Sequence, residues 1–236
     1  MLKELIRKRR SVRKFQNLKI DDPIVKDCIL NATLAPNSSN LQLWEFYHIN
    51  DVNILRSLKK ACLLQNAAKT AQQMVVVVTR QDLWKERAND NIKFLKSELS
   101  KGKISKNSFR KGENYYKKII PFIYFDFYGI FSFFRLIIAQ LIGLFRPIYR
   151  QVTYVDKRII AHKSAALAAQ NFMLSMSNYG YDTCPMEGSD TLRVKKILNL
   201  PRKSEINMVI ACGIKDKNGI YSKRFRIPFK NVYYYI

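Results

Sequence analysis

The chain has 236 residues, enough for one ordinary domain or two small ones with a sizeable core. Its composition, 47% hydrophobic and 25% charged, is typical of a folded protein and excludes a disordered one. The formal net charge of +24 favours anionic partners such as phosphates, nucleic acid or an acidic membrane surface. Because only 8 residues are glycine and the motifs GxGxxG, GxxxxGKS, GxxxxGKT and GxSxG are missing, the usual dinucleotide, P-loop and hydrolase sites are not supported.

The hydrophobic pattern predicts helices and strands that do not alternate as regular βαβ units, which favours an α+β fold. Asp21-Asp22-Pro23 is a helix start, with Asp22 as the cap and Pro23 in the first turn. The runs MVVVVT at 74–79 and NMVIAC at 207–212 predict strands buried on both faces. The other predicted elements are helices at 1–9, 22–35, 51–62 and 156–179, a strand at 45–50, helical sequence at 81–118, and a β-forming tail at 231–236 that would join a sheet edge in this chain or in a partner.

The segment 119–148, IIPFIYFDFYGIFSFFRLIIAQLIGLFRPI, is far more apolar than its surroundings. A membrane span needs about 20 mostly apolar residues, but Asp126 and Arg135 interrupt this one. Three alternatives stay open: two buried or interfacial helices hinged near Gly129, an amphipathic element on a membrane surface, or a true span. We expect a soluble chain, with peripheral membrane contact through 119–148 as the minority alternative. Flanking cations that would help such contact are Lys117, Lys118, Arg146 and Arg150.

The four cysteines and two histidines are scattered, and no CxxC pair occurs. We therefore expect no metal site, and we expect the cysteines to be reduced and buried. The N-terminus has charge but no apolar signal segment, so the sequence favours a cytoplasmic protein.

Three polar segments suit a ligand, although each alone also fits a structural role. RRSVRKF at 9–15 combines arginines with a hydroxyl, which suits a phosphomonoester. APNSSNLQLW at 35–44 is a polar loop that could bind a polyol or the edge of a heterocycle. CPMEG at 184–188 is expected to be a turn whose proline and glycine hold backbone N–H groups toward a ligand.

Together and in this order, these segments resemble the nitroreductase family of FMN-dependent oxidoreductases. The resemblance covers the N-terminal third and about 156–228, and it includes LQNAAK before MVVVV and the late SKRFRIP. It implies a mixed central sheet flanked by helices, in an intertwined homodimer with two FMN sites at its interface. It also implies a single domain over 1–236 with a variable helical insert at about 84–150. In this reading the small residues of helix 156–179 permit close approach of the two subunits, and the tail wraps the partner.

The resemblance also assigns residues to FMN. Asn37 stands where many relatives have Ser, and Leu43 where many have Pro, which affects details of the loop only. The implied cofactor-binding residues are Arg9, Arg10, Ser11, Arg224 and Arg226 at the phosphate, Arg13, Lys69 and Asn66 at the pyrimidine edge, Met186, Glu187 and Gly188 near N5 and O4, and Pro36, Asn37, Ser38 and Asn40 from the other subunit.

The implied activity is ping-pong transfer of hydride from NAD(P)H through the flavin to a nitroaromatic, quinone or similar acceptor, with no catalytic side chain and no metal. Alternatives are another flavin chemistry on the same fold, such as a dehydrogenase or dehalogenase, or a basic membrane-surface or nucleic-acid-binding protein without catalysis. No nucleic-acid partner is expected, because no recognised binding module is present. Aromatic residues of the insert suit a lid over an aromatic acceptor, or they pack the insert's own core; they are Phe122, Tyr124, Phe125, Phe127, Tyr128, Phe131, Phe133 and Phe134.

Overall fold

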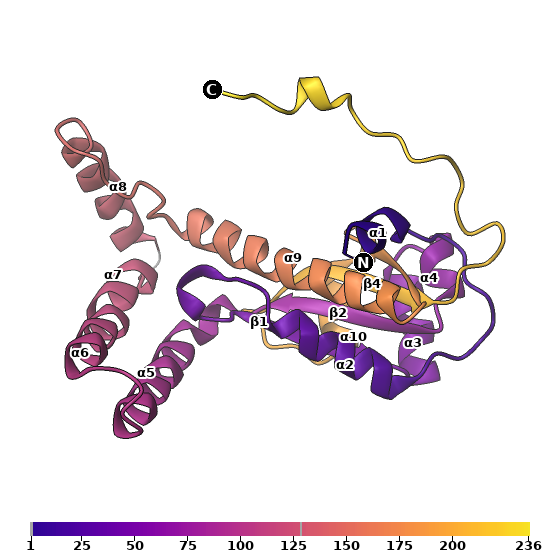
Figure 1. Cartoon of the computed structure of the whole chain (residues 1–236), viewed down its shortest axis with the longest axis horizontal. Helices are drawn as coiled ribbons and strands as arrows, with labels where there is room; N and C mark the ends of the chain where they lie inside the picture. Colours follow the sequence, from indigo (N-terminus) through magenta and orange to yellow (C-terminus); the bar gives the residue numbers. More distant parts are fainter. Residues whose placement is uncertain (1, 128) are drawn as a thin grey trace.

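A four-stranded sheet lies between two layers of helices, and an arm of further helices extends from one end of it (Figure 1). The computed structural model describes residues 2–127 and 129–236, so Met1 of the first predicted helix and Tyr128 of the aromatic set lie outside the described residues. The strands are β1 (Trp44–Ile49), β2 (Gln73–Thr79), β3 (Asp182–Met186) and β4 (Glu205–Gly213), in the order β1-β2-β4-β3. All pairs of these strands are antiparallel. The predicted α+β class is confirmed, but the sheet is antiparallel rather than mixed, and the parallel pairing of Ser11 with Thr183 is an isolated bridge outside its strands.

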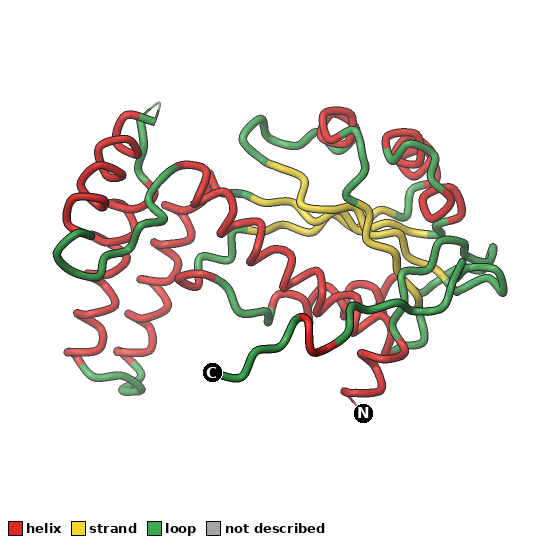
Figure 2. The backbone as a smooth tube through the Cα atoms, turned by 90° about the horizontal axis from the view of Figure 1, so that it is seen from above, coloured by secondary structure: helices red, strands yellow, loops and turns green. Residues whose placement is uncertain are grey.

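The central strand β2 is buried along its whole length, as its β-branched sequence predicts. Val76 and Val78 pack into the core on one face, with Leu58 of the helix that follows β1. Val75 and Val77 pack into the core on the other face, with Phe172. Figure 2 shows the two helical layers on either side of the strands.

Helices α1, α2, α3 and α9 agree closely with the predicted ranges, whereas α4 and α10 were not predicted. Helices α2 and α9 cover one face of the sheet, and α3, α4 and α10 contribute to the core on the other. The α-helices are α1 (Leu2–Lys8), α2 (Asp22–Thr33), α3 (Val52–Ala61), α4 (Asn66–Thr70), α5 (Trp84–Ser100), α6 (Lys106–Asn114), α7 (Ile120–Tyr124), α8 (Ile130–Ile142), α9 (Tyr154–Asn178) and α10 (Thr191–Ile197).

Two local predictions are wrong. Asp21, not Asp22, is the N-cap residue of α2. The Asp22 carboxylate instead accepts hydrogen bonds from Asn50 at 2.8 Å and from the Gln73 side chain at 2.6 Å, so it ties α2 to the sheet. The turn expected at CPMEG is also mostly absent, because residues 184–186 of this segment belong to strand β3. Pro185 is tolerated there because β3 is an edge strand.

The small residues of α9 and the C-terminal tail, both expected to contact a partner subunit, can be compared with their surroundings in one chain. Ala161, Ala165 and Ala168 of α9 are buried in this chain's own core, so intrachain packing explains their small size. The tail forms a short 3-10 helix at Phe229–Asn231 and then no strand, and Tyr235 is 91% exposed. The prediction that the tail joins a sheet edge is therefore not met inside one chain, because β propensity alone does not form a strand without an edge to pair with.

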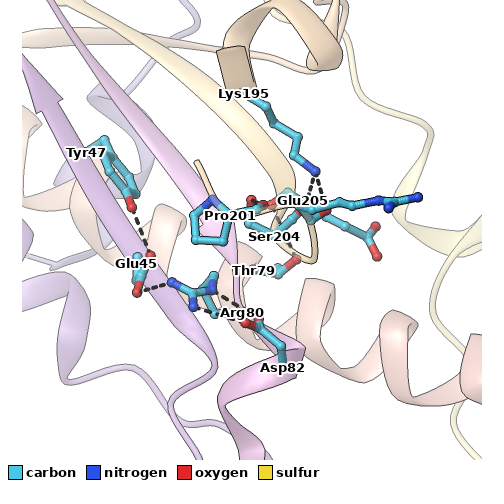
Figure 3. Close-up of polar contacts among 10 residues, drawn as sticks. Glu45, Tyr47, Thr79, Arg80, Asp82, Lys195, Pro201, Ser204 and Glu205 are labelled. Atoms are coloured by element: carbon cyan, nitrogen blue, oxygen red, sulfur yellow. Dashed lines mark hydrogen bonds and ion pairs between the residues drawn. The ribbon is translucent and has the colours of Figure 1, made fainter. Parts of the chain in front are cut away.

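Polar contacts at the end of β2 fix the start of the insert to the sheet (Figure 3). Arg80 donates to Glu45 of β1 at 2.7 Å and to Asp82 at 3.0 Å, and Tyr47 donates to the same Glu45 carboxylate. Nearby, the ammonium of Lys195 on α10 donates to the carbonyl of Ser204, directly before β4, at 2.8 Å. The insert that begins at Trp84 therefore leaves the sheet from a rigid base.

The apolar segment forms the two helices α7 and α8, and Gly129 between them has a φ of 83°, which confirms the expected hinge. Six of the eight aromatic residues assigned to a lid or to the insert's own core are exposed, so the interpretation that they pack that core is wrong for these six. The six exposed residues are Phe122, Phe125, Phe127, Phe131, Phe133 and Phe134; Tyr124 is buried.

In the part of the chain that the structure describes, no helix has the length and apolarity needed to cross a bilayer.

Candidate functional site

A cavity of about 250 Å³ opens between the end of α1 and the segment that follows β4. Of the described residues that line it, six carry cationic side chains and none carries an acidic one. The two basic motifs, at opposite ends of the sequence, therefore meet in one place. The lining cations are Arg9, Arg10, Arg13, Lys223, Arg224 and Arg226, and Ser11, Tyr221 and Ser222 add hydroxyls.

Hydrogen bonds from arginine side chains to backbone carbonyls hold the two chain ends together. Arg224 Nη2 donates to the carbonyl of Arg9 at 2.5 Å, and Arg10 Nη2 donates to the carbonyl of Ser222 at 2.8 Å. Each of these guanidiniums is thus oriented by one bond and keeps further N–H groups for a ligand.

The backbone beside the cavity is fixed by the sheet. Ser11 pairs with Thr183 of β3, and the N–H of Val12 donates to the Thr183 carbonyl at 3.0 Å. The N–H of Arg13 donates to the carbonyl of Gly219 at 2.7 Å. The N-terminal motif is consequently an extra, short partner of the sheet rather than a mobile terminus.

Mutual repulsion among the arginines marks the cavity as an anion site. Burial lowers the pKa of the Arg9 guanidinium below its ordinary value, and repulsion from Arg224, Arg226 and Arg10 lowers it further. A dianion placed among these groups would offset that repulsion and accept several charge-assisted hydrogen bonds. A phosphate monoester fits this donor set.

Helix α4 lies beside the cavity and carries two further predicted residues. Asn66 Nδ2 donates to the Tyr221 hydroxyl at 2.7 Å, and the N–H of Phe15 donates to Thr70 Oγ1 at 3.0 Å. Lys69 is exposed on the same helix. These bonds bring the predicted ring-edge residues to the rim of the predicted phosphate cavity.

The end of β3 adds an exposed stretch of backbone. Glu187 and Gly188 follow the strand directly and are exposed, and Gln65 Nε2, next to α4, donates to the Gly188 carbonyl at 2.9 Å. A Cβ at Gly188 would meet no atom within 4 Å. Met186, by contrast, is buried in the core, so its side chain serves packing while its backbone leads into this stretch.

The remaining predicted residues, Pro36, Asn37, Ser38 and Asn40, are not brought to this cavity. Their loop precedes Trp44, which pairs with Thr79 at one end of β2, whereas α4 precedes the other end (Figure 1). Seven residues of β2 correspond to about 20 Å of strand. Within one chain, the predicted FMN residues therefore form two separate groups.

This second group is bonded to the insert. Asn40 Nδ2 donates to Asn91 Oδ1 of α5 at 2.8 Å, and the Tyr116 hydroxyl donates to the carbonyl of Ser39 at 3.1 Å. The loop and the helical insert thus form one structural unit.

The sequence analysis does not predict three polar residues of the cavity, Tyr221, Ser222 and Lys223. Ser222 and Lys223 belong to the SKRFRIP segment, but only its arginines were assigned to the phosphate. Tyr221 immediately precedes that segment, and no motif distinguished it from the chain's other tyrosines. Its role depends on the hydrogen bond from Asn66, which joins residues 155 positions apart.

Comparison with known proteins identifies the family of the chain. The model of the nitroreductase family matches residues 6–214. MhqN of Bacillus subtilis, named provisionally as an NAD(P)H nitroreductase, is 24% identical over 230 residues, which cover 95% of this chain and 93% of MhqN.

Solved structures share the fold. The ydfN protein of Bacillus subtilis, provisionally a nitroreductase, aligns with a TM-score of 0.74 at 23% identity and covers 99% of this chain and 98% of its own. A protein of Exiguobacterium sibiricum, solved in complex with FMN, aligns with a TM-score of 0.70 at 18% identity, covering 100% of this chain and 97% of its own. The chain belongs to the nitroreductase family.

Proposed function

We propose that this chain binds FMN and transfers hydride from NADPH or NADH to a nitroaromatic, quinone or similar acceptor by a ping-pong mechanism. The observation that carries the proposal is the cation-rich cavity between the chain ends, which suits the phosphate of FMN. Bound FMN would supply the hydride chemistry, which no side chain of the cavity can supply.

The chain's own residues would hold and polarise the cofactor. Arg9, Arg224 and Ser11 would bind the phosphate, with their neighbours Arg10 and Arg226 adding charge. None of the described residues that line the cavity is acidic. The electrostatic attraction of these cations for a dianion is therefore not cancelled by a nearby carboxylate.

Cations beside α4 would stabilise negative charge at the pyrimidine edge. Arg13 and Lys69 are both exposed near the hydrogen bond between Asn66 and Tyr221. Positive charge in this position favours a reduced, anionic ring and so raises its tendency to accept hydride. The exposed backbone of Glu187 and Gly188 would donate N–H groups to the opposite edge.

A homodimer would join the two separated groups of FMN residues. The loop at 36–40 lies far from its own chain's cavity, so a partner's loop would have to complete each site. Helix α9 offers a surface for such a partner, because Ile159 and Leu167 are exposed two turns apart. Since the loop is bonded to α5, each insert would then stand beside the partner's flavin and act on acceptor entry.

The two half-reactions test this function separately. We expect the FMN-loaded chain to lose its visible flavin absorbance on anaerobic addition of NADPH or NADH, and to regain it on addition of menadione after the nucleotide has been removed. Steady-state rates measured against both substrates should give parallel double-reciprocal lines. Flavin that neither nucleotide reduces would contradict the proposed donor, and intersecting lines would contradict the ping-pong order.

Gly188→Ala should lower the affinity for FMN without lowering stability. The new Cβ meets no atom of the chain within 4 Å, but it would stand where the flavin has to approach the backbone. The matched control is Gly213→Ala, whose Cβ would lie 2.9 Å from Phe15 in the core and should cost about 1–3 kcal/mol of stability. Thermal melting and FMN titration of both variants check this, and a Gly188→Ala chain that binds FMN normally would place the ligand elsewhere.

A further inference from the structure

The hairpin made by α7 and α8, residues 120–127 and 129–145, carries its apolar side chains on the outside. Phe133 and Phe134 of α8 are 60% and 57% exposed, and Phe145 beyond its end is 88% exposed. Phe122, Ile138 and Leu141 are exposed as well. A monomer in water rarely leaves so many neighbouring large apolar residues uncovered.

The inward side of α8 carries polar residues beside Ala139, whereas α7 buries Ile120 and Tyr124 in an apolar cluster. Ser132 and Arg135 of α8 are buried, and Ser132 donates hydrogen bonds to the Asp126 carboxylate. Arg135 donates to the carbonyls of Phe122 at 2.5 Å and Phe125 at 2.9 Å, which are the free carbonyls at the end of α7.

A buried lysine from α9 completes this polar interior. Lys157 is 1% exposed, and its ammonium lies 3.5 Å from the Asp126 carboxylate. Arg135 lies 3.7 Å from the same carboxylate. Inside the hairpin, Asp126 thus pairs with two buried cations, while α8 presents hydrocarbon to its surroundings, which is the reverse of a water-soluble amphipathic helix.

The charges around the hairpin favour lipid as the covering partner. Between residues 114 and 155 the sequence contains one acidic residue, Asp126, which is the one held in the interior. Lys118 and Arg146 are exposed immediately before and after the hairpin. An apolar surface bordered by cations is complementary to a bilayer with anionic headgroups.

The size of the hairpin decides how it would meet a bilayer. Helix α8 has 13 residues, so it is about 20 Å long, less than the hydrocarbon core of about 30 Å. Figure 1 shows the hairpin at the extremity of the molecule, away from the sheet, so its apolar side can reach a flat surface. We propose that the α7–α8 hairpin docks the protein on anionic membranes, lying in the headgroup region without crossing the bilayer.

Sedimentation of the full chain with lipid vesicles tests the proposal. We expect binding to vesicles that contain phosphatidylglycerol, much weaker binding to vesicles of phosphatidylcholine alone, and weakening by salt. The double variant Phe133→Ser/Phe134→Ser should lower the partition coefficient at least about a hundredfold, because each exposed ring contributes at least about tenfold. Lys118→Gln/Arg146→Gln should lower binding to anionic vesicles about tenfold or more.

A matched control removes equally exposed apolar side chains elsewhere. Leu30→Ser/Leu192→Ser changes residues that are 61% and 77% exposed on α2 and α10, and it should bind vesicles like the wild type. A wild-type chain that stays in the supernatant with both vesicle types would overturn the proposal. A second outcome would also overturn it: the Phe133→Ser/Phe134→Ser variant binds vesicles like the wild type, but light scattering shows that it has changed from dimer to monomer. A second chain would then be the partner that covers the hairpin.

Fluorescence provides a readout of depth. Tryptophan placed by Phe133→Trp should be quenched by lipids brominated on their acyl chains, whereas Leu192→Trp should not be quenched beyond the background of Trp44 and Trp84. Equal quenching of the two variants would contradict docking through the hairpin. Neither measurement depends on flavin, so their failure would leave the proposed oxidoreductase function untouched.

Discussion

Replacing Arg224 with Gln is expected to weaken FMN binding about 10- to 150-fold, because the variant loses one or two charge-assisted hydrogen bonds to the phosphate. The guanidinium of Arg224 lines the cation-rich cavity and is oriented by its bond to the Arg9 carbonyl. Riboflavin, which lacks the phosphate, should bind the variant and the wild type with nearly equal affinity. Quenching of flavin fluorescence during titration measures both constants.

The control for this prediction is Arg7→Gln, which removes an exposed arginine of α1 that does not line the cavity. It lowers the net charge by the same amount, so it should leave FMN affinity nearly unchanged if the effect is local. An equal loss of FMN and riboflavin affinity in Arg224→Gln would show that the residue supports the fold of the site rather than binding the phosphate.

Asp126→Asn is expected to destabilise the hairpin by about 3–5 kcal/mol, because it leaves two buried cations without their shared carboxylate. The cations are Lys157 at 3.5 Å and Arg135 at 3.7 Å. Lys157→Met, of similar length, should be neutral or stabilising, since it removes a desolvated ammonium and keeps the pair of Arg135 with Asp126. Hydrogen exchange of the α8 amides measures both effects.

The same cluster predicts a pH dependence. Burial raises the pKa of Asp126, but hydrogen bonds from Ser132 and the charges of Lys157 and Arg135 outweigh it, so the pKa lies below its usual value. The carboxylate therefore stabilises the hairpin above the pKa of the unfolded chain, about 4, and this contribution is lost as the pH falls through the lower folded value. Unchanged α8 exchange in Asp126→Asn would contradict both expectations.

Much of the scaffold could be predicted because its signals are local. The run of valines in β2 can be buried on both faces only in a central strand, and Gly129 supplies the one backbone conformation that the bend between α7 and α8 requires. The basic motifs were also recognisable from their arginines. Their meeting in one cavity, however, depends on the long-range contact between Arg224 and Arg9.

Other features depend on tertiary context that no local pattern contains. Pro185 argues against a strand unless the strand is known to lie at a sheet edge. The alanines of α9 indicate close packing but not against what, and their neighbour proved to be this chain's own core. Thr153 caps α9 through a reciprocal bond with Asp156, so the helix begins before the acidic residue that the sequence favours as its start.

The surroundings of the exposed α7–α8 hairpin could not be predicted from its sequence pattern. Its composition left burial, membrane contact and a lid as alternatives. The arrangement of Arg135 and Ser132 on the inward side argues against burial within the chain, because a helix that buries polar residues and exposes Phe133 is complementary to an apolar environment. If the acceptor is a lipophilic quinone, docking would bring the enzyme to the phase that holds it.

The most direct test of the central claim, that the cavity binds FMN, is the visible absorbance spectrum of the chain purified without added flavin and again after incubation with FMN and gel filtration. We predict the two absorption bands of an oxidised flavin, with one FMN per chain after incubation. A colourless protein that does not retain added FMN would contradict the account, whatever the arginines of the cavity suggest.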